Sequence, residues 1–215
     1  MPVTELGIRE RKKQSTRRLL MDTAWQLFAE RGFEQVTVAD VARAADVSVA
    51  TVFNYFATKE ALVFDGMHAY ESRLVDAVRV RSVGEPALTA LTRFLLEGAE
   101  HAAQDEVGET IAVTARMVAD SPTLRARQEE ILADYTQALA EVMAAENGIS
   151  SSDPGTQAAA HALFAVHRTV LDGTRRAARA GQRGRRLARS VRAVVAGASD
   201  VVAGGLGAYA CRPRA

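Results

Sequence analysis

The stretch VSVATVFNYFATKE, residues 47–60, decides how this chain is interpreted. Apolar residues alternate in it with serine, threonine, asparagine and tyrosine, and it ends in a lysine and a glutamate. A helix buried on all sides does not need those polar groups, and a fully solvated helix does not need two phenylalanines. The stretch therefore predicts a helix with one face held by the protein and the other presented to a polar partner.

Two short helices joined by a tight turn are predicted around this stretch. Thr37 is a good N-cap, and Asp40 lies three residues on, where glutamate stands in a capping box. This helix ends near Ala45, and Ser48 caps a second one that reaches about Phe56. The pair has the form of a helix-turn-helix. Its second helix is about 13 Å long, and a DNA major groove about 12 Å wide admits a helix of that size.

The two faces of the second predicted helix carry different residues. Val52 and Phe56 lie four residues apart and anchor the helix to a small core. Asparagine pairs with adenine in the major groove, and apolar groups meet thymine methyls there. We therefore expect base edges to be read by the outward residues Val49, Ala50, Thr51, Phe53 and Asn54.

The rest of the chain is also predicted to be helical. Apolar residues recur at spacings of three and four, and no segment shows the alternation of a strand. We expect an all-α fold of about nine helices, with an N-terminal three-helix domain and a larger C-terminal helical domain. The predicted helices span about residues 11–31, 37–45, 48–56, 59–81, 107–119 and 122–146, with others starting near 86, 156 and 185.

Composition argues against several classes of protein. The 215 residues are 48% hydrophobic, which favours a folded core. No run of about 18 uncharged apolar residues and no signal-peptide core occurs, so we expect a cytoplasmic protein without membrane contact. The single cysteine, Cys211, allows no internal disulfide, and the histidines show no His-x-x-x-His spacing. Without a phosphate-binding glycine loop or a defensible Ser–His pair, we expect no metal, no cofactor and no enzyme activity.

Charge is sectored along the chain, although the formal net charge is only +1. Residues 60–167 contain seven basic and seventeen acidic residues, whereas residues 168–192 contain nine basic residues and one acidic residue. A basic run of this kind can bind nucleic acid. We favour the interpretation that the acidic segment supplies its partners within a dimer.

The residues of the helix-turn-helix resemble a known family. The signature of the TetR family of bacterial repressors is similar to Ser48, Thr51-Val52-Phe53, Tyr55-Phe56 and Thr58 to Leu62, and to the earlier Phe28 to Phe33 and Thr37-Val38. The resemblance implies a DNA-binding domain over residues 1–57 and a helical ligand-binding and dimerisation domain over residues 58–215. It also implies a homodimer through the last two helices, which leaves a palindromic operator when a small-molecule effector binds.

Phosphate contacts are expected at the ends of the short helices. Thr37, Val38 and Ser48 lie at helix N-termini, where free N–H groups attract phosphate. Tyr55 and Lys59 resemble the family's phosphate-binding tyrosine and lysine. A compact ammonium suits a single phosphate oxygen.

Two further features flank these helices. Arg9, Arg11, Lys12 and Lys13 form a basic arm that can reach the DNA backbone or the minor groove, with a solvated tail as the alternative. The family usually carries glycine in the turn where this chain has Asp46. If the backbone there is left-handed, aspartate tolerates it better than most residues.

The effector site is the least constrained prediction. Side chains that can line a ligand cavity, or simply pack in the core, are Phe94, Met117, Tyr135, His161, Phe164 and Arg168. The apolar helices favour a hydrophobic effector, and the acidic segment also suits a cation. The alternative function is a DNA-binding regulator without a small-molecule ligand, which acts constitutively or under the control of a protein partner.

Overall fold

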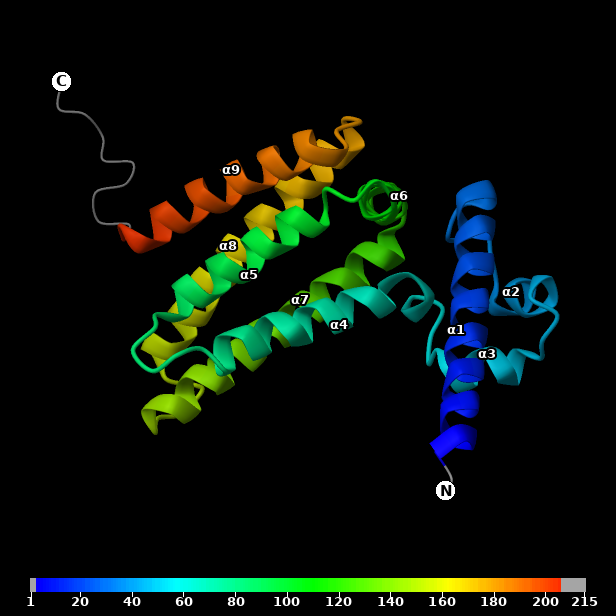
Figure 1. The fold of residues 1–215 in the computed structure, drawn as a ribbon, viewed down its shortest axis with the longest axis horizontal. Helices are drawn as coiled ribbons and strands as arrows, with labels where there is room; N and C mark the ends of the chain where they lie inside the picture. The colour runs from blue at the N-terminus through cyan, green and yellow to red at the C-terminus, as the bar shows by residue number, and fades with distance from the viewer. Residues whose placement is uncertain (1–2, 206–215) are drawn as a thin grey trace. The chain divides into compact units, whose positions relative to one another are not determined.

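The computed structural model describes residues 3–205, which form nine α-helices and no strand, as predicted. Figure 1 labels them as α1 Val3–Arg31, α2 Val38–Ala44, α3 Val49–Tyr55, α4 Ala61–Arg79, α5 Ala87–His101, α6 Asp105–Asp120, α7 Pro122–Asn147, α8 Pro154–Arg179 and α9 Gly184–Ala203. Within residues 3–205 no helix has the length and apolarity needed to cross a bilayer.

The first helix begins earlier than predicted. We expected a start near Arg11, but α1 starts at Val3. Its early turns are stabilised by contacts four residues apart: Arg11 Nε donates to the carbonyl of Gly7 at 3.0 Å, and Gln14 donates to Glu10. The predicted basic arm is therefore part of a continuous helix.

The chain divides into two compact units. One comprises Met1–His68 with Arg116–Gln128, and the other comprises Ala69–Ala115 with Glu129–Ala215. Helices α4 and α7 each contribute their first residues to the first unit and the rest to the second. The division into a DNA-binding domain that ends at residue 57 and a ligand-binding domain that begins at residue 58 stays a prediction.

The first unit is held together by the apolar stripe of α1. Leu20, Ala24 and Phe28 are fully or almost fully buried, and the Phe28 ring lies 5.0 Å from that of Phe33. The Trp25 indole donates to the carbonyl of Leu62 at 2.9 Å. Helix α1 thus serves as the support on which the shorter helices of this unit pack.

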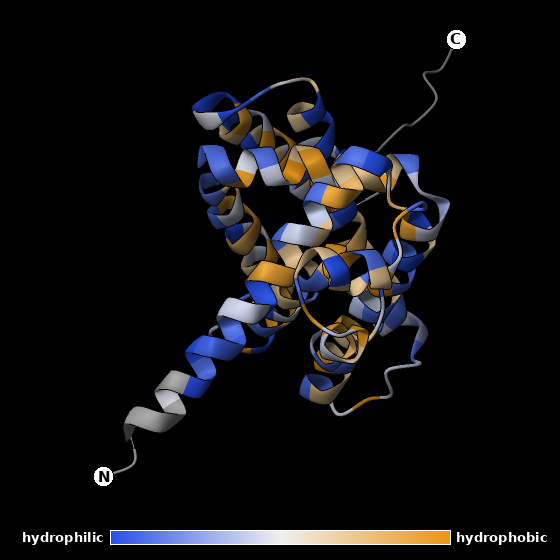
Figure 2. Ribbon diagram, turned by 90° about the vertical axis from the view of Figure 1, so that its right-hand side faces the viewer, coloured by the Kyte–Doolittle hydropathy of each residue, from blue (hydrophilic) through white to orange (hydrophobic). Residues whose placement is uncertain are grey.

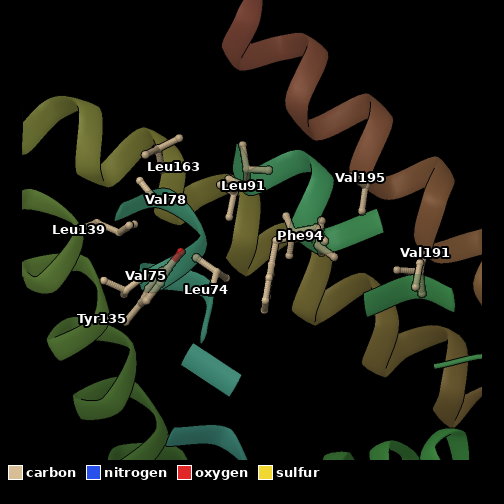
Figure 3. Close-up of a cluster of buried hydrophobic side chains, with 14 of the residues drawn as sticks. Leu74, Val75, Val78, Leu91, Phe94, Tyr135, Leu139, Leu163, Val191 and Val195 are labelled. Carbon is tan, nitrogen blue, oxygen red and sulfur yellow. The ribbon is translucent and has the colours of Figure 1, made fainter. Parts of the chain in front are cut away.

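The second unit is a helical bundle with one continuous hydrophobic core. Helices α5, α8 and α9 lie side by side (Figure 1), and α9 packs on both of the others. In Figure 2, orange apolar segments alternate with blue hydrophilic ones along the helices. The core residues drawn in Figure 3 come from α4, α5, α7, α8 and α9, and those labelled are Leu74, Val75, Val78, Leu91, Phe94, Tyr135, Leu139, Leu163, Val191 and Val195.

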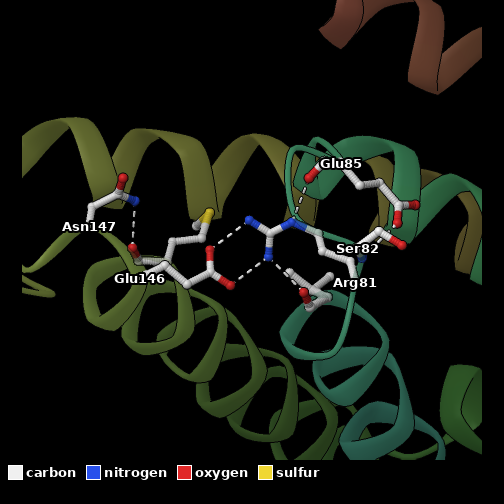
Figure 4. A network of polar contacts seen from close by, with 7 residues as sticks. Arg81, Ser82, Glu85, Glu146 and Asn147 are labelled. Carbon is white, nitrogen blue, oxygen red and sulfur yellow. Dashed lines mark hydrogen bonds and ion pairs between the residues drawn. The ribbon is translucent and has the colours of Figure 1, made fainter.

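A polar network joins the segment that follows α4 to the last turn of α7 (Figure 4). Arg81 makes two hydrogen bonds of 2.6 Å to the carboxylate of Glu146, and its Nε donates to the carbonyl of Glu85 at 2.8 Å. The paired geometry and partial burial of Arg81 favour a stable contact over a frayed surface pair. It fixes the end of α4 within the second unit.

The basic run finds acidic partners within the same chain. Arg168 pairs with Glu129 at 2.7 Å, and Arg183 pairs with Glu109 at 2.7 Å. Arg192 pairs with Glu100. All of these carboxylates belong to the acidic segment, so three residues of the basic run have acidic partners within one chain. Partners within a dimer stay a prediction.

The turn between α2 and α3 has a left-handed backbone. Asp46 has φ of 54° and is the one non-glycine residue of positive φ in residues 3–205. Its side chain is exposed. Backbone conformation, and not a buried contact, therefore limits which residues this position accepts.

Substitutions at Asp46 test that limit. Asp46→Val should lower the free energy of unfolding by about 1–2 kcal/mol, because a β-branched residue is strained at positive φ. Asp46→Gly should change it by less than about 0.5 kcal/mol, since relieved strain and added chain entropy oppose each other. Urea unfolding measures both. Equal destabilisation by the two substitutions would contradict the account of the turn.

Candidate DNA interface and effector region

Helix α3 is held from one side only. Val52 and Phe56 are 1% and 2% exposed, whereas Val49 and Phe53 on the other side are 40% and 50% exposed. Asn54, which follows Phe53 in the sequence, is also exposed. Two large apolar side chains in water on a seven-residue helix need a partner that covers them.

The cap of α3 changes what Thr51 can offer to DNA. Ser48 Oγ accepts from the backbone N–H of Thr51 at 3.0 Å and lies 2.8 Å from the Thr51 hydroxyl. The hydroxyl is therefore already engaged within the protein. The methyl group of Thr51 is left for apolar contact with a thymine methyl.

The start of α2 has the predicted capping box. Thr37 Oγ1 accepts from the N–H of Asp40 at 3.1 Å, and the Thr37 N–H donates to the Asp40 carboxylate at 3.0 Å. Hydrogen bonds from the Thr37 side chain and backbone lower the pKa of Asp40. Val38, the first residue of α2, is half-buried. The cap fixes the entry of the chain into α2.

Arg17 of α1 clamps the far end of α3. Its Nη1 donates to the carbonyl of Tyr55 at 2.9 Å, and its other nitrogens bond the carboxylate of Asp65 on α4. The guanidinium also lies 4.5 Å from the centre of the Phe56 ring. One side chain thus joins α1, α3 and α4, a role that sequence reasoning missed because its partners lie far away in the chain.

Lys59 has a structural role beside the one predicted. Its ammonium donates to the carbonyls of Phe33 and Val36, each at 3.0 Å, and lies 4.0 Å from the centre of the Phe33 ring. An ammonium has three N–H donors, so these bonds leave one for a phosphate oxygen. The same residue therefore holds the α1–α2 turn and remains able to contact DNA.

The other residues that were predicted to contact DNA lie at positions that are compatible with such a contact. Tyr55 is half-buried at the end of α3, and Ala50 is exposed at its start. The four basic residues of the arm are exposed on α1: Arg9, Arg11, Lys12 and Lys13. The N-terminal part of this helix is mostly blue, or hydrophilic, in Figure 2. The four residues present positive charge along one rigid helix, suited to a phosphate backbone.

A helix-turn-helix with one face buried and the other exposed defines a DNA-binding regulator as the class of protein. The family model described as bacterial regulatory proteins, tetR family, matches residues 20–65. The regulator TcmR of Streptomyces glaucescens is 32% identical over 156 residues, which are 68% of this chain and 67% of TcmR. The chain belongs to the TetR family of bacterial transcriptional regulators.

Two further comparisons extend over most of the chain. The putative mycofactocin biosynthesis regulator MftR of Mycobacterium tuberculosis is 28% identical over 165 residues, 73% of this chain and 78% of MftR. The structure of FadR from Bacillus subtilis in complex with stearoyl-CoA shares the fold with a TM-score of 0.54 and 20% identity. It covers 85% of this chain and 97% of FadR.

Three of the residues predicted for the effector site lie together in the second unit. The rings of Tyr135 and Phe164 are 6.3 Å apart, and Phe94 joins them through Tyr70 and His167. Phe94 and Tyr135 are buried, and Phe164 is half-buried. The result is a chain of neighbouring rings that spans α4, α5, α7 and α8.

The other three residues lie elsewhere. His161 is exposed, with Nδ1 2.7 Å from the carbonyl of Gln157 on its own helix. Arg168 forms its ion pair with Glu129 at the surface. Met117 is buried, but it belongs to the first unit. The aromatic cluster does not include them.

Sequence reasoning missed two polar residues of the cluster, Glu71 and His167. Both stand in apolar stripes: Glu71 precedes Leu74, Val75 and Val78 at helical spacing. In the same way, His167 lies in the stripe Leu163, Val166 and Val170. A polar residue at a core position of an apolar stripe indicates a buried polar group, and this pattern could have identified both residues from the sequence.

Burial changes the titration of these two residues. Burial raises the pKa of Glu71 to about 8, against the opposing influence of Arg175. Burial also lowers the pKa of His167 to about 4. Both side chains are therefore largely neutral at pH 7, and the cluster presents hydrogen-bonding groups without net charge.

Glu71 makes the stability of the protein fall as pH rises. Its pKa is higher in the folded than in the unfolded chain, so the folded state binds more protons between about pH 4.5 and 8. His167 acts in the opposite sense, and only between about pH 4 and 6.5. The melting temperature of the wild type should fall between pH 6.5 and 8.5. The fall should be clearly smaller for Glu71→Gln. Parallel curves for the two proteins in thermal unfolding would contradict the burial of this carboxyl.

Proposed function

We propose that this TetR-family regulator is a homodimeric repressor, released from an inverted-repeat operator by a small-molecule effector. Residues 1–57 bind DNA, and residues 58–215 bind the effector and form the dimer. The observation that carries the proposal is the outer face of α3, where Val49 and Phe53 are exposed while the inner face is buried. In a dimer, two such helices dock in successive major grooves.

Dimerisation through α8 and α9 has support in the character of their exposed faces. Ala158 and Ala165 on α8 are exposed, as are Ala193 and Gly197 on α9. Small side chains allow a second pair of helices to approach closely. The last two helices therefore offer a self-complementary surface for a two-fold axis.

The position of α7, which runs from the first unit into the second, supports control of DNA binding by an effector. This helix carries Tyr135 in the second unit, and its beginning belongs to the first. There Ser121 and Thr123 donate to the carboxylate of Glu34, which lowers the pKa of Glu34. Glu34 follows Phe33, whose carbonyl binds Lys59. A displacement of α7 therefore has a hydrogen-bonded route to the DNA-facing residues.

The proposal also rests on the similarity to FadR, whose structure contains stearoyl-CoA. That similarity supports a small-molecule effector for this chain in general, and no particular molecule. A ligand can release DNA only if it binds the DNA-free conformation more tightly.

Operator binding is the first test. The folded dimer should give a specific gel shift with the DNA upstream of its own gene at about 0.15 M salt, a concentration that screens non-specific contacts. A screen by thermal shift should find small molecules that raise the melting temperature and reverse the gel shift. No specific shift with confirmed dimer would overturn the proposal. A specific shift that no small molecule reverses would favour the alternative of a regulator without such a ligand.

Lys59 and Asn54 should differ in their effects on DNA binding. Lys59→Ala should weaken binding to all DNA sequences by the same factor. It should also reduce the slope of log affinity against log salt concentration by about 1. Asn54→Ala should cost about 1–3 kcal/mol at one base position and relax the preference there. Fluorescence anisotropy with single-base operator variants measures both.

A stability control is needed because Lys59 also holds the α1–α2 turn. Arg81→Met loosens the second unit by removing the bonds to Glu146, and it should leave operator affinity unchanged. Identical specificity profiles for Lys59→Ala and Asn54→Ala would refute the division of roles.

A further inference from the structure

The second unit contains buried polar atoms that the protein itself does not satisfy. Within residues 3–205, Glu71 Oε1, Tyr135 Oη and His167 Nδ1 are buried and have no hydrogen-bond partner in the protein. Their residues are 5%, 3% and 2% exposed. Buried polar groups are nearly always paired in proteins, because an unpaired one loses its hydration without compensation.

The three groups come from three helices and lie close together. The rings of Tyr135 on α7 and His167 on α8 are 5.0 Å apart in an edge-on arrangement. Tyr70, the neighbour of Glu71 on α4, stacks on His167 at 6.0 Å. Burial raises the pKa of Tyr135, and the neighbouring Tyr70 and then Glu71 raise it further. The three residues with unpaired atoms therefore belong to one region of the second unit, where α4, α7 and α8 bring their side chains together, and we refer to them as the polar cluster.

Aromatic rings surround this polar cluster. The Phe94 ring lies 5.2 Å from that of Tyr70, and the Phe164 ring lies 6.3 Å from that of Tyr135. Flat rings on several helices favour offset stacking with a planar aromatic molecule. The polar groups at their centre supply the hydrogen bonds that orient such a molecule.

The charge state of the cluster narrows the class of ligand. Glu71 and His167 are largely neutral at pH 7, as described above, and Tyr135 keeps its proton. The groups facing Glu71 from its neighbours are Arg175 on α8 and Asp134 on α7, which are of opposite charge. A protonated carboxyl, a phenol and a neutral imidazole together offer both donors and acceptors. They match hydroxyl and carbonyl groups better than carboxylates or phosphates.

We propose that Glu71, Tyr135 and His167 form the recognition centre for the effector, a neutral planar aromatic molecule that carries hydroxyl or carbonyl groups. Tyr70, Phe94 and Phe164 contact its ring faces. This inference rests on the proposed function, in which the second unit binds the effector. Binding satisfies the three orphaned atoms and rearranges α7, which leads to Glu34 in the first unit.

The first experiment measures binding of 2,7-dihydroxynaphthalene, with naphthalene and naphthalene-2,7-disulfonate as matched probes. The dihydroxy compound should raise the melting temperature of the full-length protein and bind at least about tenfold more tightly than either control. Equal binding of naphthalene would show that the polar cluster is not used. Absence of binding by the dihydroxy compound at millimolar concentration would overturn the proposed class of ligand.

Variants separate a ligand site from a structural polar core. Tyr135→Phe should weaken binding of 2,7-dihydroxynaphthalene about tenfold. It should leave the melting temperature of the free protein unchanged or raise it, since the lost hydroxyl has no partner. Glu71→Gln should weaken binding while it preserves the shape of the side chain. Thr136→Val is the matched control, because this buried hydroxyl bonds the carbonyl of Leu132 on its own helix.

The outcomes distinguish failure of this inference from failure of the proposed function. A Tyr135→Phe protein that binds the probe like wild type, or a free protein that loses stability on this substitution, would overturn the inference. Operator binding by the same wild-type preparation is measured in parallel. If the operator is bound and the probe is not, only the effector assignment fails. If the operator is not bound, the proposed function itself fails.

Discussion

Helix α3 depends on being fastened from one side. Two buried side chains, Val52 and Phe56, hold its inner face, and Arg17 fixes its last turn through the carbonyl of Tyr55. A seven-residue helix has little stability of its own, so these tertiary contacts determine that it forms and where it points. The residues of its outer face are then not needed to hold the helix in place. This separation leaves Val49 and Phe53 exposed for the proposed contact with DNA.

The second unit shows a complementary constraint, because its core contains groups that the core does not satisfy. Glu71, Tyr135 and His167 reduce the stability of the free protein. Natural proteins accept such losses most often at sites that bind something. Helix α7 begins in the first unit and carries Tyr135 in the second, so the cluster and the bonds to Glu34 involve residues of one continuous helix or its cap.

Local features of the fold were predictable from the sequence, and contacts distant in the sequence were not. The capping box of Thr37, the cap of Ser48 and the positive φ of Asp46 depend on neighbouring residues, and their signals are local. The predicted start of α1 was wrong because its charged first turns lack an apolar stripe and yet suit a helix. The clamp by Arg17 joins residues 48 apart, which no local pattern indicates. Of the effector candidates, the aromatic residues were easier to find than buried Glu71, because a carboxyl suggests a solvated position.

In the proposed complex the outer face of α3 lies in the major groove of the operator. The most direct measurement is photocrosslinking of the protein to operator DNA in which each thymine in turn is replaced by 5-bromouracil, whose bromine stands in the major groove. Mass spectrometry then identifies the crosslinked peptide. Crosslinks are expected within residues 49–54, at thymines in both half-sites. A stable, specific complex whose crosslinks map to α1 or to the second unit, and never to α3, would contradict this placement of the helix.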